Sequence, residues 1–119
     1  MATPTDSILD KTKKILGIAA DYPAFDIDII MHINTVFSTL SELGIGPEEG
    51  FSIEDNTVEW KTFLVDKKYL NQVKSYMYLR VRMLFDPPTT SFAIEAIKNQ
   101  ITEFEWRLSL YAPKADYTT

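Results

Sequence analysis

Residues 74–97 of the chain are KSYMYLRVRMLFDPPTTSFAIEAI, and this stretch decides how the chain is organised. Apolar residues before the double proline recur at helical spacing: Leu70, Val73, Met77, Val81 and Leu84. Neither Pro87 nor Pro88 can donate a backbone hydrogen bond, and each disfavours helical geometry in the residue before it. The stretch therefore predicts two long helices joined at a rigid Pro87-Pro88 turn.

Three more helical segments are predicted before this pair. The first, SILDKTKKILG, has Asp6 or Ser7 as its N-cap and Gly17 at its C-terminal end. The second runs from about residue 25 to 43, where Gly44 and Pro47 follow it. A short third helix over about 57–64 is indicated by a capping box from Asn56 to Glu59. The predicted bounds of the two long helices are 67–85 and, after a cap at Thr89 or Thr90, about 91–111.

The whole pattern predicts an all-α, single-domain bundle of about five helices. No segment has the period-2 alternation of a strand, and 119 residues suit one domain. The inward stripe expected for the last helix comprises Ala93, Ile97, Ile101, Phe104, Leu108 and Tyr111. We expect residues 1–111 to form the helical domain and residues 112–119, APKADYTT, to form a flexible C-terminal tail.

Composition excludes several classes of protein. The chain has no cysteine, so disulfide frameworks and zinc-thiolate sites are excluded. It has no apolar run of the roughly 18 residues that span a bilayer, and its N-terminus does not resemble a signal peptide. A net charge of −5 argues against a dedicated nucleic-acid binder. We therefore expect a soluble protein that is not exported by a classical signal and does not bind membranes.

The charge is unevenly distributed along the chain. Residues 1–59 hold 11 acids and 3 bases, whereas residues 60–119 hold 6 acids and 9 bases. This asymmetry can arise from solvated helix faces alone. It can also indicate identical copies that pack head to tail, with the acidic half against the basic half, as in rings. The sequence leaves both interpretations open.

The titratable residues do not form a catalytic pattern. His32 has a single acid, Asp28, at i−4, which is far short of a metal site or a triad. Asp26 and Asp28 are two residues apart on a helix, so they point to different faces and cannot act as a general acid-base pair. The same holds for Glu103 and Glu105. Motifs for nucleotides and zinc are absent. We expect no enzymatic activity, cofactor or metal site.

The candidate functional residues are two arginines and an apolar helix face. Arg80 and Arg82 leave the fourth helix on opposite flanks, so one can pair with Asp86 or an acid of the last helix while the other faces a partner. The last helix has a second apolar face, away from its inward stripe, formed by Phe92, Ala96, Trp106 and Leu110. Aromatic residues and arginine commonly anchor interfaces. We therefore expect Arg80, Arg82, Phe92, Trp106 and Leu110 to contact another subunit or partner.

The order of these segments also resembles a known family. ILDKTKKILGI, FDIDIIMHINTVFSTLSELGIGPEEGFSIED and VKSYMYLRVRMLFDPPTTSFAIEAIKNQITEFEWRL together look like the small head-tail connector (adaptor) proteins of long-tailed bacteriophages. The resemblance covers about residues 7–110, and its most telling pieces are YLRVRMLFDPP and EFEWRL.

The resemblance implies an α-helical structural protein without catalytic residues. It implies a homo-oligomeric ring, commonly a dodecamer, bound beneath the portal protein at the capsid vertex of the virion. Such a ring extends the DNA channel without sequence-specific binding and supports a stopper or tail protein. It would be assembled in the host cytoplasm.

Two other functions remain as alternatives. The first is a small helical phage or bacterial regulator that binds a host protein or nucleic acid, which would need a basic or pocketed face. The second is a helical-bundle enzyme with scattered carboxylates, and it would depend on His32, Asp26 and Asp28.

Overall fold

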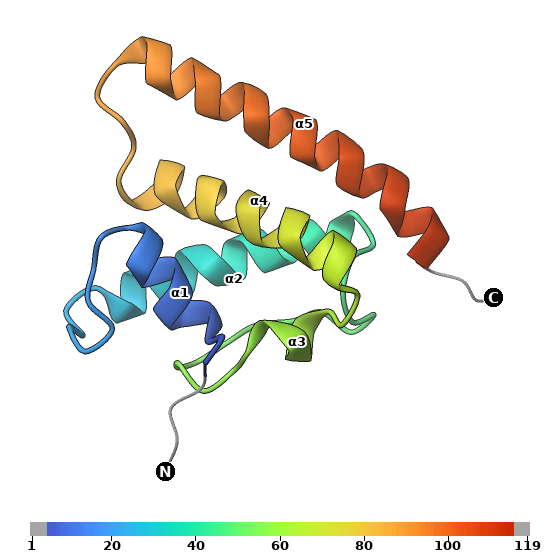
Figure 1. Cartoon of the computed structure of the whole chain (residues 1–119), viewed down its shortest axis with the longest axis horizontal. Helices are drawn as coiled ribbons and strands as arrows, with labels where there is room; N and C mark the ends of the chain where they lie inside the picture. Colours follow the sequence, from blue (N-terminus) through green and yellow to red (C-terminus); the bar gives the residue numbers. More distant parts are fainter. Residues whose placement is uncertain (1–4, 116–119) are drawn as a thin grey trace.

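The structure is a computed structural model that describes the backbone of residues 5–115 and the side chains of residues 5–66 and 68–111. The described residues form five helices: α1 (Ile8–Ile15), α2 (Asp26–Glu42), α3 (Trp60–Phe63), α4 (Lys67–Phe85) and α5 (Ser91–Ala115) (Figure 1). Between residues 5 and 115 there is no strand, only an isolated antiparallel bridge between Ser7 and Glu59. The predicted all-α class is confirmed.

Three side chains cap the helices at their N-termini. The Ser7 hydroxyl accepts a hydrogen bond from the backbone N–H of Asp10 at 3.2 Å, so the second of the two predicted caps of α1 is the one used. Thr90 accepts from the backbone N–H of Ala93 at 3.2 Å at the start of α5. Asp66 caps α4 in the same way. Each cap satisfies one of the N–H groups that a helix leaves without an internal partner.

The prediction for the third helix is wrong in its start and its cap. Residues 57–59 are not helical, and the amide of Asn56 donates to the carboxylate of Asp10 at 3.3 Å instead of forming a capping box. The N–H of Ile8 donates to the carbonyl of Val58 at 3.0 Å, and the N–H of Trp60 donates to the carbonyl of Asp6 at 3.2 Å. This pairing with the N-terminal segment holds residues 58–59 extended, so the helix begins only at Trp60.

Two further details differ from the sequence prediction. Leu84 is exposed rather than part of the inward stripe of α4, because Phe85 takes the inward place there and packs against Phe25 with ring centroids 5.4 Å apart. Helix α5 continues to Ala115, four residues beyond the predicted end at Tyr111. Residues 116–119 of the predicted tail lie outside the described residues, and the flexible tail stays a prediction.

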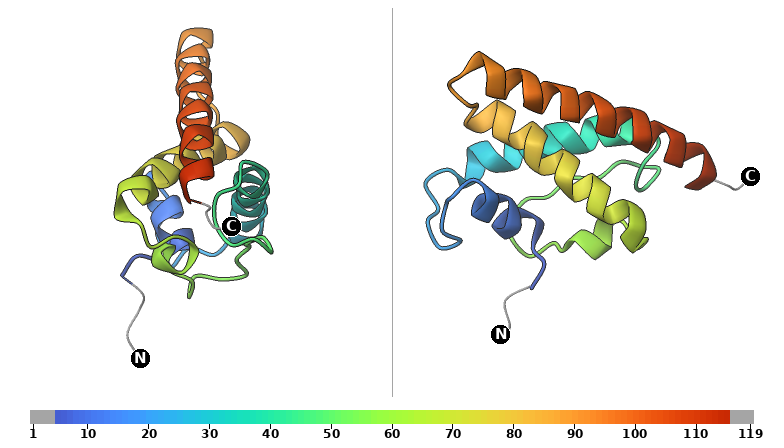
Figure 2. Two further views of the ribbon diagram at one scale, coloured as in Figure 1. Left: turned by 90° about the vertical axis from the view of Figure 1, so that its right-hand side faces the viewer. Right: turned by 45° about the horizontal axis from the view of Figure 1, so that its top comes forward.

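The helices are arranged in layers with α4 in the middle. Helix α5 packs along one side of α4, while α2 packs on its other side and α1 covers α2 (Figures 1 and 2). The core between these layers is apolar, and its largest fully buried side chains include Trp60, Tyr76, Phe37, Ile8, Ile29, Ile33, Leu40, Met77 and Leu108. The inward stripe predicted for α5 is buried or half-buried along its length. The left view of Figure 2 shows the first half of α5 extending beyond the rest of the molecule.

The long loop between α2 and α3 is held by side-chain hydrogen bonds rather than by helix. The side-chain amide of Asn34 on α2 accepts from the N–H of Ile53 at 2.8 Å and donates to the carbonyl of Ile53 at 3.0 Å. Because Ile53 is buried, these two bonds satisfy backbone groups that water does not reach.

In the described part of the chain, no helix has the length and apolar character needed to cross a membrane.

Candidate functional site

The joint between α4 and α5 is short and contains both prolines. Helix α4 ends at Phe85 and α5 begins at Ser91, so Pro87 and Pro88 lie between them. Asp86, the residue before Pro87, has φ −148° and ψ 70°, outside the helical region, as steric contact with a following proline requires. The joint turns the chain back on itself, so that α4 and α5 lie side by side.

The side chain of Arg80 is used inside the molecule. Its guanidinium donates to the hydroxyl of Tyr76 at 2.8 Å and lies 3.6 Å from the carboxylate of Glu105 on α5. The Tyr76 hydroxyl in turn donates to Glu105 at 2.7 Å. Burial of Tyr76, together with its hydrogen bond to Glu105, raises the pKa of the Tyr76 phenol to about 12. Of the two arrangements predicted for the arginine pair, Arg80 takes the one that ties α4 to an acid of α5.

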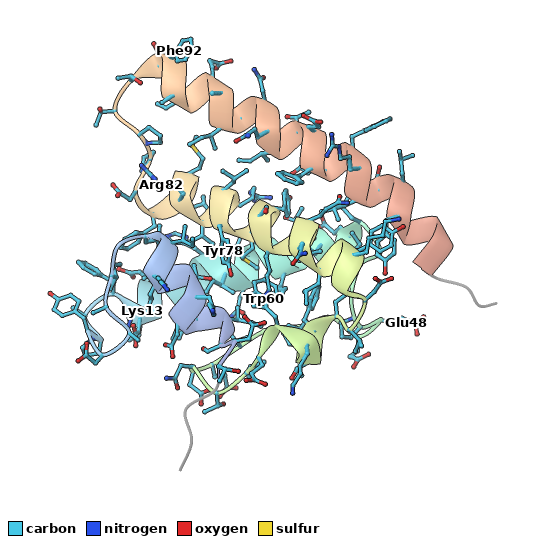
Figure 3. All side chains as sticks on the ribbon, in the orientation of Figure 1. Lys13, Glu48, Trp60, Tyr78, Arg82 and Phe92 are labelled. Atoms are coloured by element: carbon cyan, nitrogen blue, oxygen red, sulfur yellow. The ribbon has the colours of Figure 1, made fainter. Side chains whose placement is uncertain are left out.

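Arg82 lies on the other side of α4 and is exposed. Its Nε donates to the backbone carbonyl of Asp86 at 2.9 Å, which closes the last turn of α4 (Figure 3). The rest of its guanidinium faces solvent close to the proline joint. Arg82 is therefore placed to contact another molecule, whereas Arg80 is largely occupied within this one.

The second apolar face of α5 is not covered by the described part of the chain. Phe92 is 86% exposed at the start of the helix, as Figure 3 also shows, and Trp106 is 63% and Leu110 51% exposed near its other end. Burial of this face against another helix of the same chain, one of the two predicted possibilities, does not occur among these residues. Its burial against another molecule stays a prediction.

A second exposed apolar surface was not identified from the sequence. Ile27 and Met31 lie one turn apart on α2, and they are 81% and 57% exposed. They point away from Ile29 and Ile33, which face the core. The sequence did contain the signal. Two apolar residues at i and i+4, on the helix face opposite the core stripe, form a second apolar face that the core of the same molecule cannot cover.

A buried lysine was also missed. Lys13 on α1 is fully buried; its ammonium donates to the carbonyls of Ala20 at 3.0 Å and Tyr22 at 2.8 Å and lies 2.7 Å from the carboxylate of Asp26. These contacts fix the loop between α1 and α2 and hence the start of α2 (Figure 3). A lysine that supports a loop has the same local sequence pattern as a surface lysine.

The residues considered for catalysis are not brought together. His32 lies beside the ring of Phe85 with centroids 6.4 Å apart, and no hydrogen bond joins it to Asp28 among the described side chains. Glu103 pairs with Arg107, while Glu105 binds Tyr76. Within the described residues no group of three or more His, Cys, Asp and Glu side chains could hold a metal ion.

A shallow hollow of about 290 Å³ lies beside α1, lined by Ser7, Asp10, Lys11 and Lys14 among others. Its side chains repeat no catalytic arrangement.

Comparison with known proteins identifies the family of this chain. No curated protein and no solved structure matches the chain. A family described as phage connector protein matches residues 8–115, which include all five helices. Such a family points to a structural, non-enzymatic protein of the phage particle that assembles with other virion proteins. The chain belongs to the phage connector protein family.

Proposed function

We propose that the chain is a head-tail connector, or adaptor, that forms a ring between the portal protein and the stopper or tail protein. The observation that carries the proposal is the family match over residues 8–115, which spans every helix of the fold. The ring would extend the DNA channel at the capsid vertex, in the neck of the virion. The protein would act by assembly and catalyse nothing.

The exposed side chains of α5 support an assembling protein. Phe92, Trp106 and Leu110 place apolar area on the surface of one helix, and such area is a solubility liability for a free monomer. In a ring, a neighbouring copy or the portal protein would cover it. Arg82 and Phe92 lie at the end of the molecule that carries the proline joint, where Pro87 and Pro88 keep the two helices at a fixed angle.

The number of copies and the route of the DNA follow from the same proposal. A dodecamer would match one connector chain to each chain of a twelvefold portal ring. DNA would pass through without sequence-specific binding, and a net charge of −5 agrees with a chain that does not hold DNA tightly. Assembly would take place in the host cytoplasm.

The test is a count of this chain in purified particles by quantitative mass spectrometry. The portal protein, measured in the same digest with isotope-labelled standard peptides, provides the internal scale. About one copy of the chain per portal subunit is expected for an adaptor ring. Absence of the chain from intact, infectious particles would contradict the proposal and favour a regulator that acts in the infected cell.

A further inference from the structure

We propose that the exposed ridge at the start of α2 binds the exposed ridge near the end of α5 on a second copy of this chain. The α2 ridge consists of Ile27 and Met31, with Thr35 one turn further on. The α5 ridge consists of Trp106 and Leu110, with Thr102 one turn before them. This inference rests on the proposed ring and names the two surfaces that would form its repeating contact.

The two ridges have matching geometry. In each, apolar side chains are spaced four residues apart, so they form a row that runs nearly along the helix. Rows at i and i+4 on two helices interdigitate when the axes cross at about 50°, the commonest packing class of helices in globular proteins. Each ridge ends in a threonine that is exposed. Two short apolar rows of the same length can thus cover one another.

One exposed charge lies next to each ridge, and the two have opposite sign: Asp28 follows Ile27, and Arg107 follows Trp106. Residues 21–31 contain Asp21, Asp26 and Asp28 and no basic residue. Residues 102–110 contain Arg107 and two acids, of which Glu103 pairs with Arg107 and Glu105 accepts from Tyr76. Asp26 is paired with Lys13, but Asp28 is exposed and has no ion pair among the described side chains. Contact between the two ridges can therefore bring Asp28 of one copy close to Arg107 of another.

The contact has to be heterologous because the ridges lie on different sides of the molecule. Helix α5 is the outer layer on one side of α4, whereas α2 packs on the other side and turns Ile27 and Met31 away from the core. Figure 1 shows α5 along the upper edge and the start of α2 at the lower left. One copy can thus bind a neighbour through each ridge at once, and such contacts close into a ring or continue as a filament.

Existing side chains leave the α5 ridge free to bind. Arg107 pairs with Glu103 one turn away, but both side chains are about half exposed, and an exposed pair of this kind contributes little. Glu103 and Arg107 can therefore rearrange when Asp28 of a second copy approaches. The α2 ridge is held in place from inside, since Lys13 fixes the loop that precedes it.

The experiment uses cysteine cross-linking, because the natural chain has no cysteine. Thr35→Cys and Thr102→Cys place one thiol at the end of each ridge without altering an apolar side chain. Equal amounts of the two purified full-length variants are mixed at high concentration and treated with a flexible bis-maleimide. The same treatment is applied to purified particles that contain both variants. Thr35→Cys mixed with Asn71→Cys, another exposed position, is the matched control.

A cross-linked dimer in the first mixture, well above the control mixture and above either variant alone, is expected. Cross-linking no stronger than the control in both settings would overturn the inference. So would a dimer formed equally well by Thr102→Cys alone, since it would indicate that α5 meets α5. Circular dichroism with unchanged unfolding temperatures confirms that the variants fold.

A charge swap tests the pairing itself. Asp28→Arg in the Thr35→Cys background should lower the cross-linked yield about fivefold, the size expected when an exposed ion pair is lost. Arg107→Asp in the Thr102→Cys partner should restore the yield. Glu54→Arg, an equal charge change at another exposed acid, should leave the yield unchanged. Loss of yield with Glu54→Arg, or no rescue by Arg107→Asp, would contradict the assignment.

The outcomes separate this inference from the proposed function. A specific cross-link in purified protein, with the chain absent from particles, would keep the ridge contact and remove the connector role. The chain present at one copy per portal subunit, with no cross-link, would keep the connector role and remove the ridge contact.

Discussion

The hydroxyl of Tyr76 on α4 donates a 2.7 Å hydrogen bond to the carboxylate of Glu105 on α5, and Arg80 donates to the same hydroxyl at 2.8 Å. Helix α5 packs mainly against α4, so this polar cluster is a main fixed point between the outer helix and the rest of the fold. Buried polar groups favour one arrangement because any other leaves them without partners. The cluster therefore helps to hold α5 in its register along α4.

Replacing Tyr76 should make the free energy of unfolding less dependent on pH in the alkaline range. The phenol has an ordinary pKa of 10.0, which the fold raises to about 12. Between these values the unfolded chain loses the proton first, so the free energy of unfolding falls as pH rises from 10 toward 12. Tyr76→Phe should remove much of that fall and cost about 1–2 kcal/mol at neutral pH. Urea unfolding at several pH values measures both effects.

Tyr22→Phe is the matched control for this experiment, because Tyr22 is half exposed. It should shift the free energy of unfolding by no more than about 0.5 kcal/mol and leave the pH dependence as it is. A Tyr76→Phe profile that falls as steeply as that of the natural chain would show that other groups cause the alkaline loss.

Lys13 should contribute far more to the free energy of unfolding than its neighbour Lys14. Lys13→Met removes a buried ammonium and leaves the carboxylate of Asp26 and two backbone carbonyls without their partner. We expect a loss of about 3 kcal/mol in the free energy of unfolding. Lys14→Met, at an exposed position on the same helix, should change it by about 0.5 kcal/mol or less. Chemical denaturation of the two variants measures the difference, and equal losses would contradict the role given to Lys13.

Two glycines with the same backbone angle should differ in their tolerance of a methyl group. Gly46 and Gly50 both have φ +94°, so alanine is strained at either position. A Cβ atom at Gly46 would also clash with the Cε1 of Phe63, whereas a Cβ atom at Gly50 would meet no atom within 4 Å. Gly50→Ala should therefore cost about 1–2 kcal/mol, and Gly46→Ala roughly 2 kcal/mol more. Thermal unfolding of the two variants measures both costs. Equal costs would show that Phe63 moves away freely.

Neighbouring positions on α5 should separate assembly from stability. Trp106→Ala truncates an exposed side chain, so helix content and unfolding temperature should be retained while incorporation into particles falls. Leu108→Ala truncates a fully buried side chain and should cost about 3 kcal/mol of stability. Arg82→Glu should behave as Trp106→Ala does, because Arg82 is exposed beside the joint. Complementation of a phage that lacks the gene measures incorporation, and normal particles from Trp106→Ala and Arg82→Glu would remove both residues from the interface.

The sequence by itself determined where most of the helices lie. The bounds of α4 were predicted as observed, and α1 and α2 were close, because apolar periodicity, caps and Gly or Pro stops act within a few residues. The exposure of Trp106 could be anticipated in the same way, since it lies on the helix face opposite Leu108 and its inward stripe.

Only the tertiary structure decided how distant residues meet. The start of α3 is set by backbone pairing of residues 58–60 with residues 6–8, and no local pattern contains that contact. Lys13 is buried because a loop folds over it, and the place of Arg80 depends on the position of Glu105 across two helices. Local propensity fixes which segments are helical, whereas polar side chains reach their partners only through long-range packing, whose geometry a one-dimensional pattern does not hold.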